Sequence, residues 1–405
     1  MTTTSAVRFL DRTTPPHIAT LVLLAGIAAM NMSVFLPSLP AMAAHFQADY
    51  SVMQLAVSGY LGVTAALQLV IGPISDRYGR RPVILGCLAI FLVATLGCMF
   101  APSVEVFLVF RMMQGVVAVG LVLSRAVVRD MYPMNEAASM IGYVTMGMAL
   151  VPMVAPMIGG ALDQAFGWRA AFIFLFLSGA SILAMAWADQ GETAETRPTS
   201  FAAQVRDYPE LLTSRRFWGY VAASAFASGA FFGFLGGAPL VASEVFGLSP
   251  LWAGIGFGAP AIGYAVGNFL SGRYSARFGV NRMILAGTII VTTGMGISLL
   301  LILVGLKTAF LFFAFCCTVG LGNGLVIPNA AAGMLSVRPH LAGTASGLGS
   351  AFMIGGGAAM AAITGTLLDL SQSAAPLVAV MFTTSALALA SVLYVIRRER
   401  QVTAA

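Results

Sequence analysis

The sequence predicts an all-α integral membrane protein that contains two related halves. Hydrophobic residues make up 59% of its 405 residues and charged residues only 9%, whereas a soluble domain has about 25% charged residues. Twelve apolar segments have the length of about 20 residues that a membrane span requires, and each must be a helix because lipid satisfies no backbone hydrogen bonds. Residues 72–85 recur 200 positions later, with matches at Gly272, Arg277, Gly279 and Leu285. The chain is therefore expected to be a duplicated membrane protein with twelve transmembrane helices.

Charges, prolines and glycines delimit the twelve predicted spans. They lie at 18–39, 51–75, 82–101, 103–129, 137–163, 168–188, 217–240, 251–275, 281–303, 308–335, 341–368 and 375–396. We predict an N-terminal half of six helices over 1–188, a cytoplasmic linker over 189–216 and a C-terminal half of six helices over 217–405. The linker holds the longest polar stretch. Its segment 202–214 is open to two interpretations, a short helix on the membrane surface or a solvated loop.

The basic residues predict the orientation in the membrane. If the N-terminus is cytoplasmic, nearly all of the 21 lysines and arginines fall at cytoplasmic positions, and the exceptions are Arg111, Arg169 and Lys307. The positive-inside rule therefore places both termini in the cytoplasm. The net charge of +6 follows from this bias and needs no nucleic-acid partner. The four cysteines fall within spans, where free thiols pack as small hydrophobes, and no zinc-binding spacing occurs, so no metal or cofactor is predicted.

The loop between the second and third spans is the most informative segment, because it places charges and a turn glycine in an apolar chain. It contains Gly72, Asp76, Arg77, Gly79, Arg80 and Arg81. Gly79 permits a left-handed turn, and the carboxylate of Asp76 is expected to bind the N-terminus of the eleventh span, where the helix dipole favours an anion. The second copy has Ala276 at the corresponding position, so this latch is expected on one side only. Alternatively, the charges serve only to fix the topology.

The fourth span carries a charge at membrane depth. Arg111 lies about two turns into the helix, with Gln114 one turn further on. An unpaired cation inside a membrane is costly and usually faces a cavity or a substrate pathway. The alternatives are that Arg111 extends to the outer interface or pairs with Glu105.

The inner end of the same span carries a second group of charges, Arg125, Arg129 and Asp130. Asp130 is placed to meet Arg77 or Arg80 at the inner surface. An equally consistent interpretation is a structural helix cap.

The fifth span combines Pro152 and Pro156 with Gly159 and Gly160. The prolines remove backbone donors and bend the helix, and the paired glycines allow another helix to approach closely. We interpret this segment as a packing hinge.

These motifs resemble those of the major facilitator superfamily. The loop at 72–85 is similar to its signature loop between helices two and three, and residues 111–115 to its fourth-helix motif. Residues 147–160 resemble the fifth-helix motif of its antiporters, in the double-proline form of the bicyclomycin and chloramphenicol resistance subfamily, whose first-helix ending resembles residues 36–40. The resemblance implies two pseudo-symmetric six-helix bundles that rock around a central cavity. It also implies export of small, mostly hydrophobic drugs in exchange for protons. We expect the chain to act as a monomer in the lipid bilayer of a bacterial inner membrane.

One position departs from this resemblance. Drug antiporters of this subfamily commonly have Asp four residues before the first proline of that ending, and this chain has Ser33. All fifteen acidic residues lie at span ends or in loops. Three interpretations stay open: coupling through Asp76 with Asp130, coupling through Glu105 beside Arg111, or transport without the expected use of protons.

The resemblance also implies which helices line the cavity, and the polar and aromatic residues on them are the candidate substrate contacts. These are Asn31, Tyr60, Arg111, Gln114, Tyr143, Phe231, Phe232, Asn268, Asn323 and Asn329. Few charges among several amides and rings favour a neutral or weakly anionic amphipathic substrate. The nearest alternative is a transporter of one endogenous solute on the same fold. A membrane-embedded enzyme is disfavoured because no His-Glu-x-x-His or Gly-x-Ser-x-Gly motif is present.

Overall fold

The computed structural model describes residues 7–132, 140, 144, 151, 154–194, 211–338, 342–369 and 373–403, and over these ranges the chain contains helices and no strand. Ten helical segments in these ranges are long and apolar enough to cross a membrane. Two predicted spans are not among the ten. Most of the fifth lies outside the described residues, and the eighth is divided into two helices. The protein is a helical multi-pass membrane protein.

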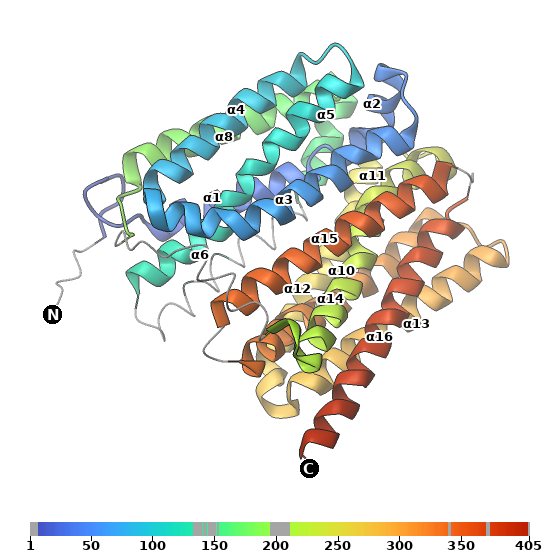
Figure 1. Cartoon of the computed structure of the whole chain (residues 1–405). Coiled ribbons are helices and arrows are strands. Elements are labelled where there is room, and N and C mark those ends of the chain that lie inside the picture. The colour runs from blue at the N-terminus through green and yellow to red at the C-terminus, as the bar shows by residue number, and fades with distance from the viewer. Residues whose placement is uncertain are drawn as a thin grey trace.

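The N-terminal helices form one bundle (Figure 1). They are α1 (Ile18–Ser33), the 3₁₀ turn η1 (Leu36–Ser38), α2 (Leu39–Phe46), α3 (Tyr50–Tyr78), α4 (Arg80–Met99), α5 (Val104–Met113), the 3₁₀ segment η2 (Gln114–Ala118), α6 (Val119–Met131), a helical segment over 154–166, and α8 (Arg169–Asp189). The first span changes from α1 through η1 to α2 because Pro37 and Pro40 each lack a backbone donor.

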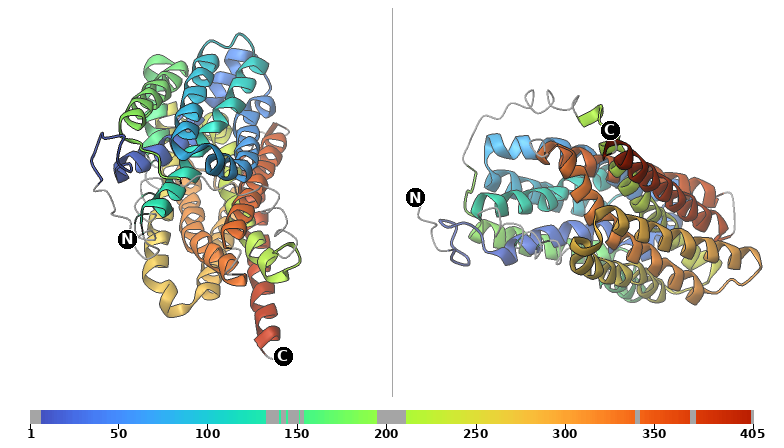
Figure 2. Two further views of the ribbon diagram at one scale, coloured as in Figure 1. Left: turned by 60° about the vertical axis from the view of Figure 1, so that its left-hand side comes forward. Right: turned by 90° about the horizontal axis from the view of Figure 1, so that it is seen from below.

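The C-terminal helices form a second bundle, which Figures 1 and 2 show beside the first. They are α10 (Arg215–Leu240), the π turn η3 (Val241–Val245), α11 (Pro250–Phe257), α12 (Ala259–Phe278), α13 (Val280–Leu303), α14 (Ala309–Val337), α15 (Ala342–Asp369) and α16 (Ala375–Thr403). The eighth predicted span divides between α11 and α12 at Gly258, because Pro260 supplies no donor to the preceding turn. Most of the predicted linker over 189–216 lies outside the described residues, so its limits stay a prediction.

One end of the molecule carries most of the arginines. We call it the basic end; it contains the start of α1, the α3–α4 loop, the end of α6, the start of α10 and the end of α16. The two bundles contact each other along α3 and α15. At the end opposite the basic end, the Tyr50 hydroxyl on α3 donates a 2.9 Å hydrogen bond to the Gly236 carbonyl oxygen on α10. Direct contact at that end joins the two halves.

Candidate functional site

A buried polar cluster surrounds Arg111 in the middle of the N-terminal bundle. The Arg111 guanidinium donates to the Asn31 side chain at 2.9 Å and to the Asn31 carbonyl oxygen at 2.9 Å. It also donates to Gln114 Oε1 at 2.7 Å and to the Ala56 carbonyl oxygen at 3.0 Å. Gln114 in turn donates to the Thr95 hydroxyl at 2.8 Å. The cluster therefore joins α1, α3, α4 and α5.

Aromatic rings enclose the same guanidinium. Its central carbon lies 4.2 Å from the ring centroid of Phe35 and 4.2 Å from that of Tyr60, a distance at which a cation is attracted to the ring face. Arg111 has no solvent exposure. The rings and amides together shield the charge.

Glycines bring the supporting helices close enough to enclose Arg111. A Cβ on Gly120 of α6 would lie 2.1 Å from the Leu24 carbonyl oxygen of α1, and one on Gly115 would lie 3.0 Å from a Val63 methyl of α3. No larger residue fits at Gly120 without moving α1. These contacts hold the fourth span against the first and second.

The two alternative environments considered for Arg111 are therefore wrong. The side chain does not extend to the outer interface, because it is fully buried. It does not pair with Glu105, which is in the first turn of α5 and exposed. Within the described ranges Arg111 contacts amide and carbonyl oxygens but no carboxylate. In this conformation it is closed to substrate.

The other predicted cavity residues differ in how deeply they are buried. Phe232 is buried against α15, where a Cβ on Gly357 would lie 2.0 Å from its ring. Asn329 is buried and donates to Ser271 Oγ and to the Leu325 carbonyl oxygen, each at 2.8 Å. Phe231 is half-buried. Tyr143 lies outside the described residues.

Two of the asparagines predicted to line the cavity differ in their hydrogen bonding. Asn323 is buried, and its side-chain oxygen has no hydrogen-bond partner within the described ranges. Asn268 is half-buried and donates to the Tyr264 carbonyl oxygen at 2.8 Å. Asn268 is therefore the amide that remains near an accessible surface.

Arg125 is placed differently from the rest of its charge group. It lies on α6, half-buried, and its Nε atom has no hydrogen-bond partner within the described part of the chain. Tyr264 of α12, in the other half, lies close enough to interact with it electrostatically. Tyr264 was not among the sequence candidates, because a single tyrosine in a span carries no distinguishing pattern. Arg129, one turn after Arg125, is exposed.

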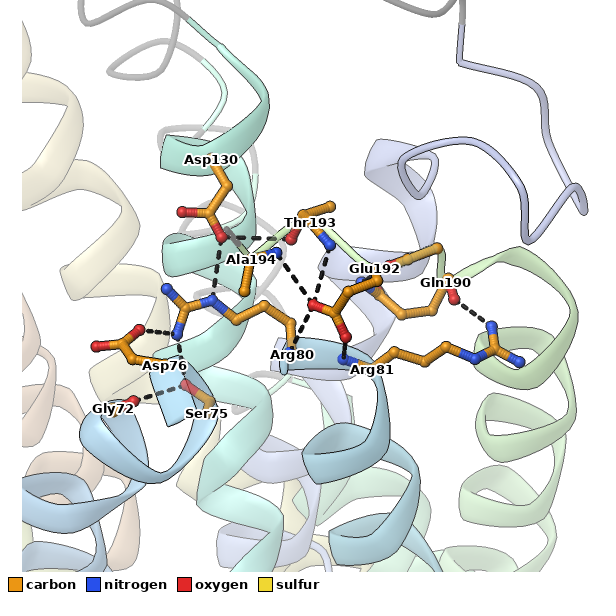
Figure 3. Close-up of polar contacts among 11 residues, drawn as sticks. Gly72, Ser75, Asp76, Arg80, Arg81, Asp130, Gln190, Glu192, Thr193 and Ala194 are labelled. Carbon is orange, nitrogen blue, oxygen red and sulfur yellow. Dashed lines mark hydrogen bonds and ion pairs between the residues drawn. The ribbon is translucent and has the colours of Figure 1, made fainter. Parts of the chain in front are cut away.

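The α3–α4 loop forms an ion-pair network at the basic end (Figure 3). Arg80 contacts Asp76 at 2.5 Å and Asp130 of α6 at 3.0 Å, and it donates to Ser75 Oγ at 2.5 Å. Of the two arginines considered as partners of Asp130, Arg80 is the one that contacts it, and Arg77 is exposed beside Tyr78. Among the described residues Asp76 pairs within its own half, with Arg80. The predicted contact with the start of the eleventh span falls largely on residues outside the described ranges and stays a prediction.

Glu192, just after α8, completes the same network. Its carboxylate accepts the backbone N–H of Arg80 at 2.8 Å and that of Arg81 at 3.2 Å, so it caps the start of α4. The Arg81 guanidinium donates to the carbonyl oxygens of Gln190 and Trp187. Gly79 has φ of 95°, and a Cβ there would lie 2.4 Å from Glu192 Oε2. Sequence reasoning missed Glu192, since nothing in the polar stretch distinguishes it from its acidic neighbours.

Glycines of the fifth span form close contacts between helices. A Cβ on Gly159 would lie 1.6 Å from the Val34 carbonyl oxygen, at the end of α1. A Cβ on Gly160 would lie 2.2 Å from the Pro250 carbonyl oxygen of α11, and one on Gly254 of α11 would lie 2.3 Å from the Pro156 carbonyl oxygen. The last two contacts join the halves. Gly72 has open space around it, and Pro152 lies outside the described residues.

Comparisons with known proteins agree with this architecture. The Major Facilitator Superfamily profile matches residues 21–362. The MFS-type transporter YdgK of Bacillus subtilis is 30% identical over 90% of this chain and 91% of its own length. The chloramphenicol resistance protein of Pseudomonas aeruginosa is 32% identical over 82% and 78% of the two chains. Multidrug resistance protein D of Escherichia coli is 30% identical over 87% and 89%.

A solved structure shares the fold. The bacterial homologue of the human lysosomal transporter Spinster superposes with a TM-score of 0.74 over 95% of this chain and 96% of that chain, at 17% identity. At this identity the likeness concerns the fold alone. Taken with the profile match and the relatives, it shows that the chain belongs to the Major Facilitator Superfamily of membrane transporters.

Proposed function

We propose that the protein is a secondary active multidrug exporter of a bacterial inner membrane, which moves small amphipathic compounds by alternating access in exchange for protons. Two relatives at 30–32% identity are named for chloramphenicol or multidrug resistance and are matched over most of their length. The basic end is the cytoplasmic end in this proposal, because lysines and arginines accumulate on the inner side.

The observation that carries the proposed substrate class is the unpartnered cation between the halves. Arg125 is half-buried, and in the described part of the chain no carboxylate neutralises it. A half-buried cation without a carboxylate partner is stabilised when a ligand places an electron-rich group beside it. Tyr264 of α12 adds a hydroxyl near it, and Asn268, one turn further along α12, adds an amide on the same helix. A neutral or weakly anionic amphipathic compound with a nitro, hydroxyl or carboxylate group matches this set.

Contacts between the halves support the alternating-access part of the proposal. Tyr50 joins the halves through a hydrogen bond from its hydroxyl, and Gly160 and Gly254 join them through direct backbone approach. The ion pairs of Asp76 and Asp130 lie within the N-terminal half. Transport requires the contacts between the halves at Tyr50, Gly160 and Gly254 to separate. Release of Asp76 from Arg80 would then free its carboxylate for the start of α15, as the sequence predicts.

Transport into inside-out vesicles tests the proposal. Vesicles from a pump-deleted bacterium that expresses the chain should accumulate phenicols, fluoroquinolones or ethidium, and an uncoupler should abolish the accumulation. Arg125→Gln should lower uptake of the nitro- and carboxyl-bearing drugs by about tenfold, because a hydrogen bond to a charged group contributes about 1.5–3 kcal/mol. Arg277→Gln, an exposed change at the end of α12, is the matched control. Equal loss in both variants would refute the role of Arg125.

The second candidate is a transporter of one endogenous solute. It is favoured by Ser33, which occupies the position of the usual first-helix carboxylate, is buried, and donates to the Ala29 carbonyl oxygen at 3.1 Å. A serine hydroxyl does not ionise in the physiological pH range, so Ser33 cannot take the place of a proton-carrying carboxylate. If no drug accumulates although the protein is present in the membrane, this second candidate replaces the first.

A further inference from the structure

A groove at the basic end opens between the start of α13 and the end of α16. It has a volume of 830 Å³, and its walls include Arg282, Leu285, Leu393, Ile396, Arg397 and Arg400. The two helices lie side by side, and the end of α16 extends beyond its neighbours (Figures 1 and 2). The groove is remote from the Arg111 cluster and from the contacts between the halves.

Three unneutralised cations line this groove. Arg282, Arg397 and Arg400 are exposed, and within the described ranges none of them forms an ion pair. Glu399 also lines the groove, but it is already engaged by Arg216 at 2.9 Å and by the Asn281 side chain. The groove therefore presents an excess of positive charge.

The opposite character appears along the same two helices away from the basic end. Leu393 of α16, at the edge of the groove, is 50% exposed, and further along α13 Ile289, Ile297 and Leu300 are 46%, 47% and 63% exposed. In a membrane protein such residues face acyl chains. A cationic groove at the interface that continues into an apolar surface is complementary to a lipid with an anionic headgroup.

We propose that this groove binds an anionic phospholipid of the inner leaflet, with its phosphate among the three arginines and its acyl chains along α13 and α16. The lipid connects the start of α13 to the end of α16. In the wall of the groove, Glu399 of α16 pairs with Arg216 at the start of α10, and Tyr220 of α10 donates to Asn281 of α13 at 2.9 Å. Lipid binding therefore stabilises the basic end of the C-terminal bundle. The proposal rests on the membrane orientation and is independent of which solute is transported.

Lipid binding to the purified protein tests this site. Phosphatidylglycerol and phosphatidylethanolamine are titrated into the detergent-solubilised full chain, and bound lipid is counted by native mass spectrometry. Each arginine near an anionic group contributes roughly fivefold in affinity. The double variant R282Q/R397Q should therefore bind phosphatidylglycerol roughly thirtyfold more weakly. The matched control R273Q/R277Q removes two exposed arginines outside the groove and should retain wild-type binding.

Each outcome decides the question. Preferential binding of phosphatidylglycerol that only R282Q/R397Q loses supports the site. Equal losses in the two double variants, or equal binding of the zwitterionic lipid, would overturn it. Glycerol 3-phosphate separates a lipid from a soluble phosphate, because equal affinity for it would assign the groove to a soluble ligand. If R282Q/R397Q is not monodisperse, R397Q alone decides, with an expected loss of roughly fivefold.

Discussion

Replacement of Gly160 by alanine should open the end of the molecule opposite the basic end. The new Cβ would lie 2.2 Å from the Pro250 carbonyl oxygen of α11, and ordinary contact begins at 3.4 Å. Both atoms belong to backbone or are fixed directly to it, so no side-chain rotation relieves the overlap. The fifth span and α11, which belong to different halves, must separate by about 1 Å.

The expected magnitude follows from that separation. Extra volume in a well-packed contact costs about 1–3 kcal/mol. The cost falls on the conformation in which the halves meet here and is absent when they are apart. The ratio of the two conformations should therefore change by about 5- to 150-fold.

Distances between spin labels measure this change. Labels at Phe166 and Phe310, which are 78% and 81% exposed, report on the end opposite the basic end. Labels at Tyr78 and Phe278, which are 62% and 45% exposed, report on the basic end. The four cysteines are first replaced by alanine. In Gly160→Ala the first distance should lengthen and the second should shorten.

A matched control separates conformational change from general damage. A Cβ on Gly263 would lie 2.0 Å from the Cys317 carbonyl oxygen, but both residues belong to the C-terminal half. Gly263→Ala should lower thermal stability and leave both label distances unchanged. The reasoning is refuted if Gly160→Ala leaves the distances unchanged, or if Gly263→Ala changes them equally.

Three further predictions follow from buried or bridging charges. Arg111→Lys should reduce uptake of every transported drug by a similar factor and lower the thermal unfolding temperature, because an ammonium cannot reach all four acceptors; altered selectivity would contradict this. Asp189→Ala should speed tryptic cleavage after Arg12 by roughly 30-fold. The fully buried carboxylate of Asp189 accepts from Leu10 N, His17 N and Thr20 Oγ1, and its loss costs at least about 2 kcal/mol locally. An unchanged cleavage rate would show that other contacts hold the segment before α1. Asp130→Asn should abolish uncoupler-sensitive uptake but not exchange of labelled for unlabelled drug, and wild-type uptake would exclude Asp130 from coupling.

The fold could be predicted because membrane solvation leaves few options. Long apolar segments must be helices, and the repeated loop identifies two related halves. Local geometry was harder to predict. The eighth span divides at Gly258 because of Pro260, but Pro328 stays inside α14, so a proline alone does not reveal where a span divides. The 3₁₀ segment after Met113 depends on how neighbouring helices pack, and hydropathy carries no information about packing.

The candidate site was predictable by residue type but not by partner. Asn31 and Arg111 are separated by 80 positions and meet, together with Gln114, through helix packing. Only the spacing of Arg111 and Gln114 on one helix is visible in the sequence. Glu192 lies 112 residues from the backbone N–H that it caps. Such a cap requires the end of α8 to meet the start of α4, which no local pattern encodes.

Arg111 and Arg125 have different environments, which suit them to different roles. Arg111 is fully buried, and its guanidinium is satisfied by neutral oxygens and two rings. An exchange of partners there would leave buried acceptors unpaired, at about 1–3 kcal/mol each, so Arg111 fixes the first, second, third and fourth spans as a unit. Within the described part of the chain Arg125 has no such partners, and it lies near Tyr264 of the other half. A ligand gains most from the cation that the protein leaves unsatisfied, so we propose that Arg125 discriminates among substrates and that Arg111 keeps the N-terminal half rigid.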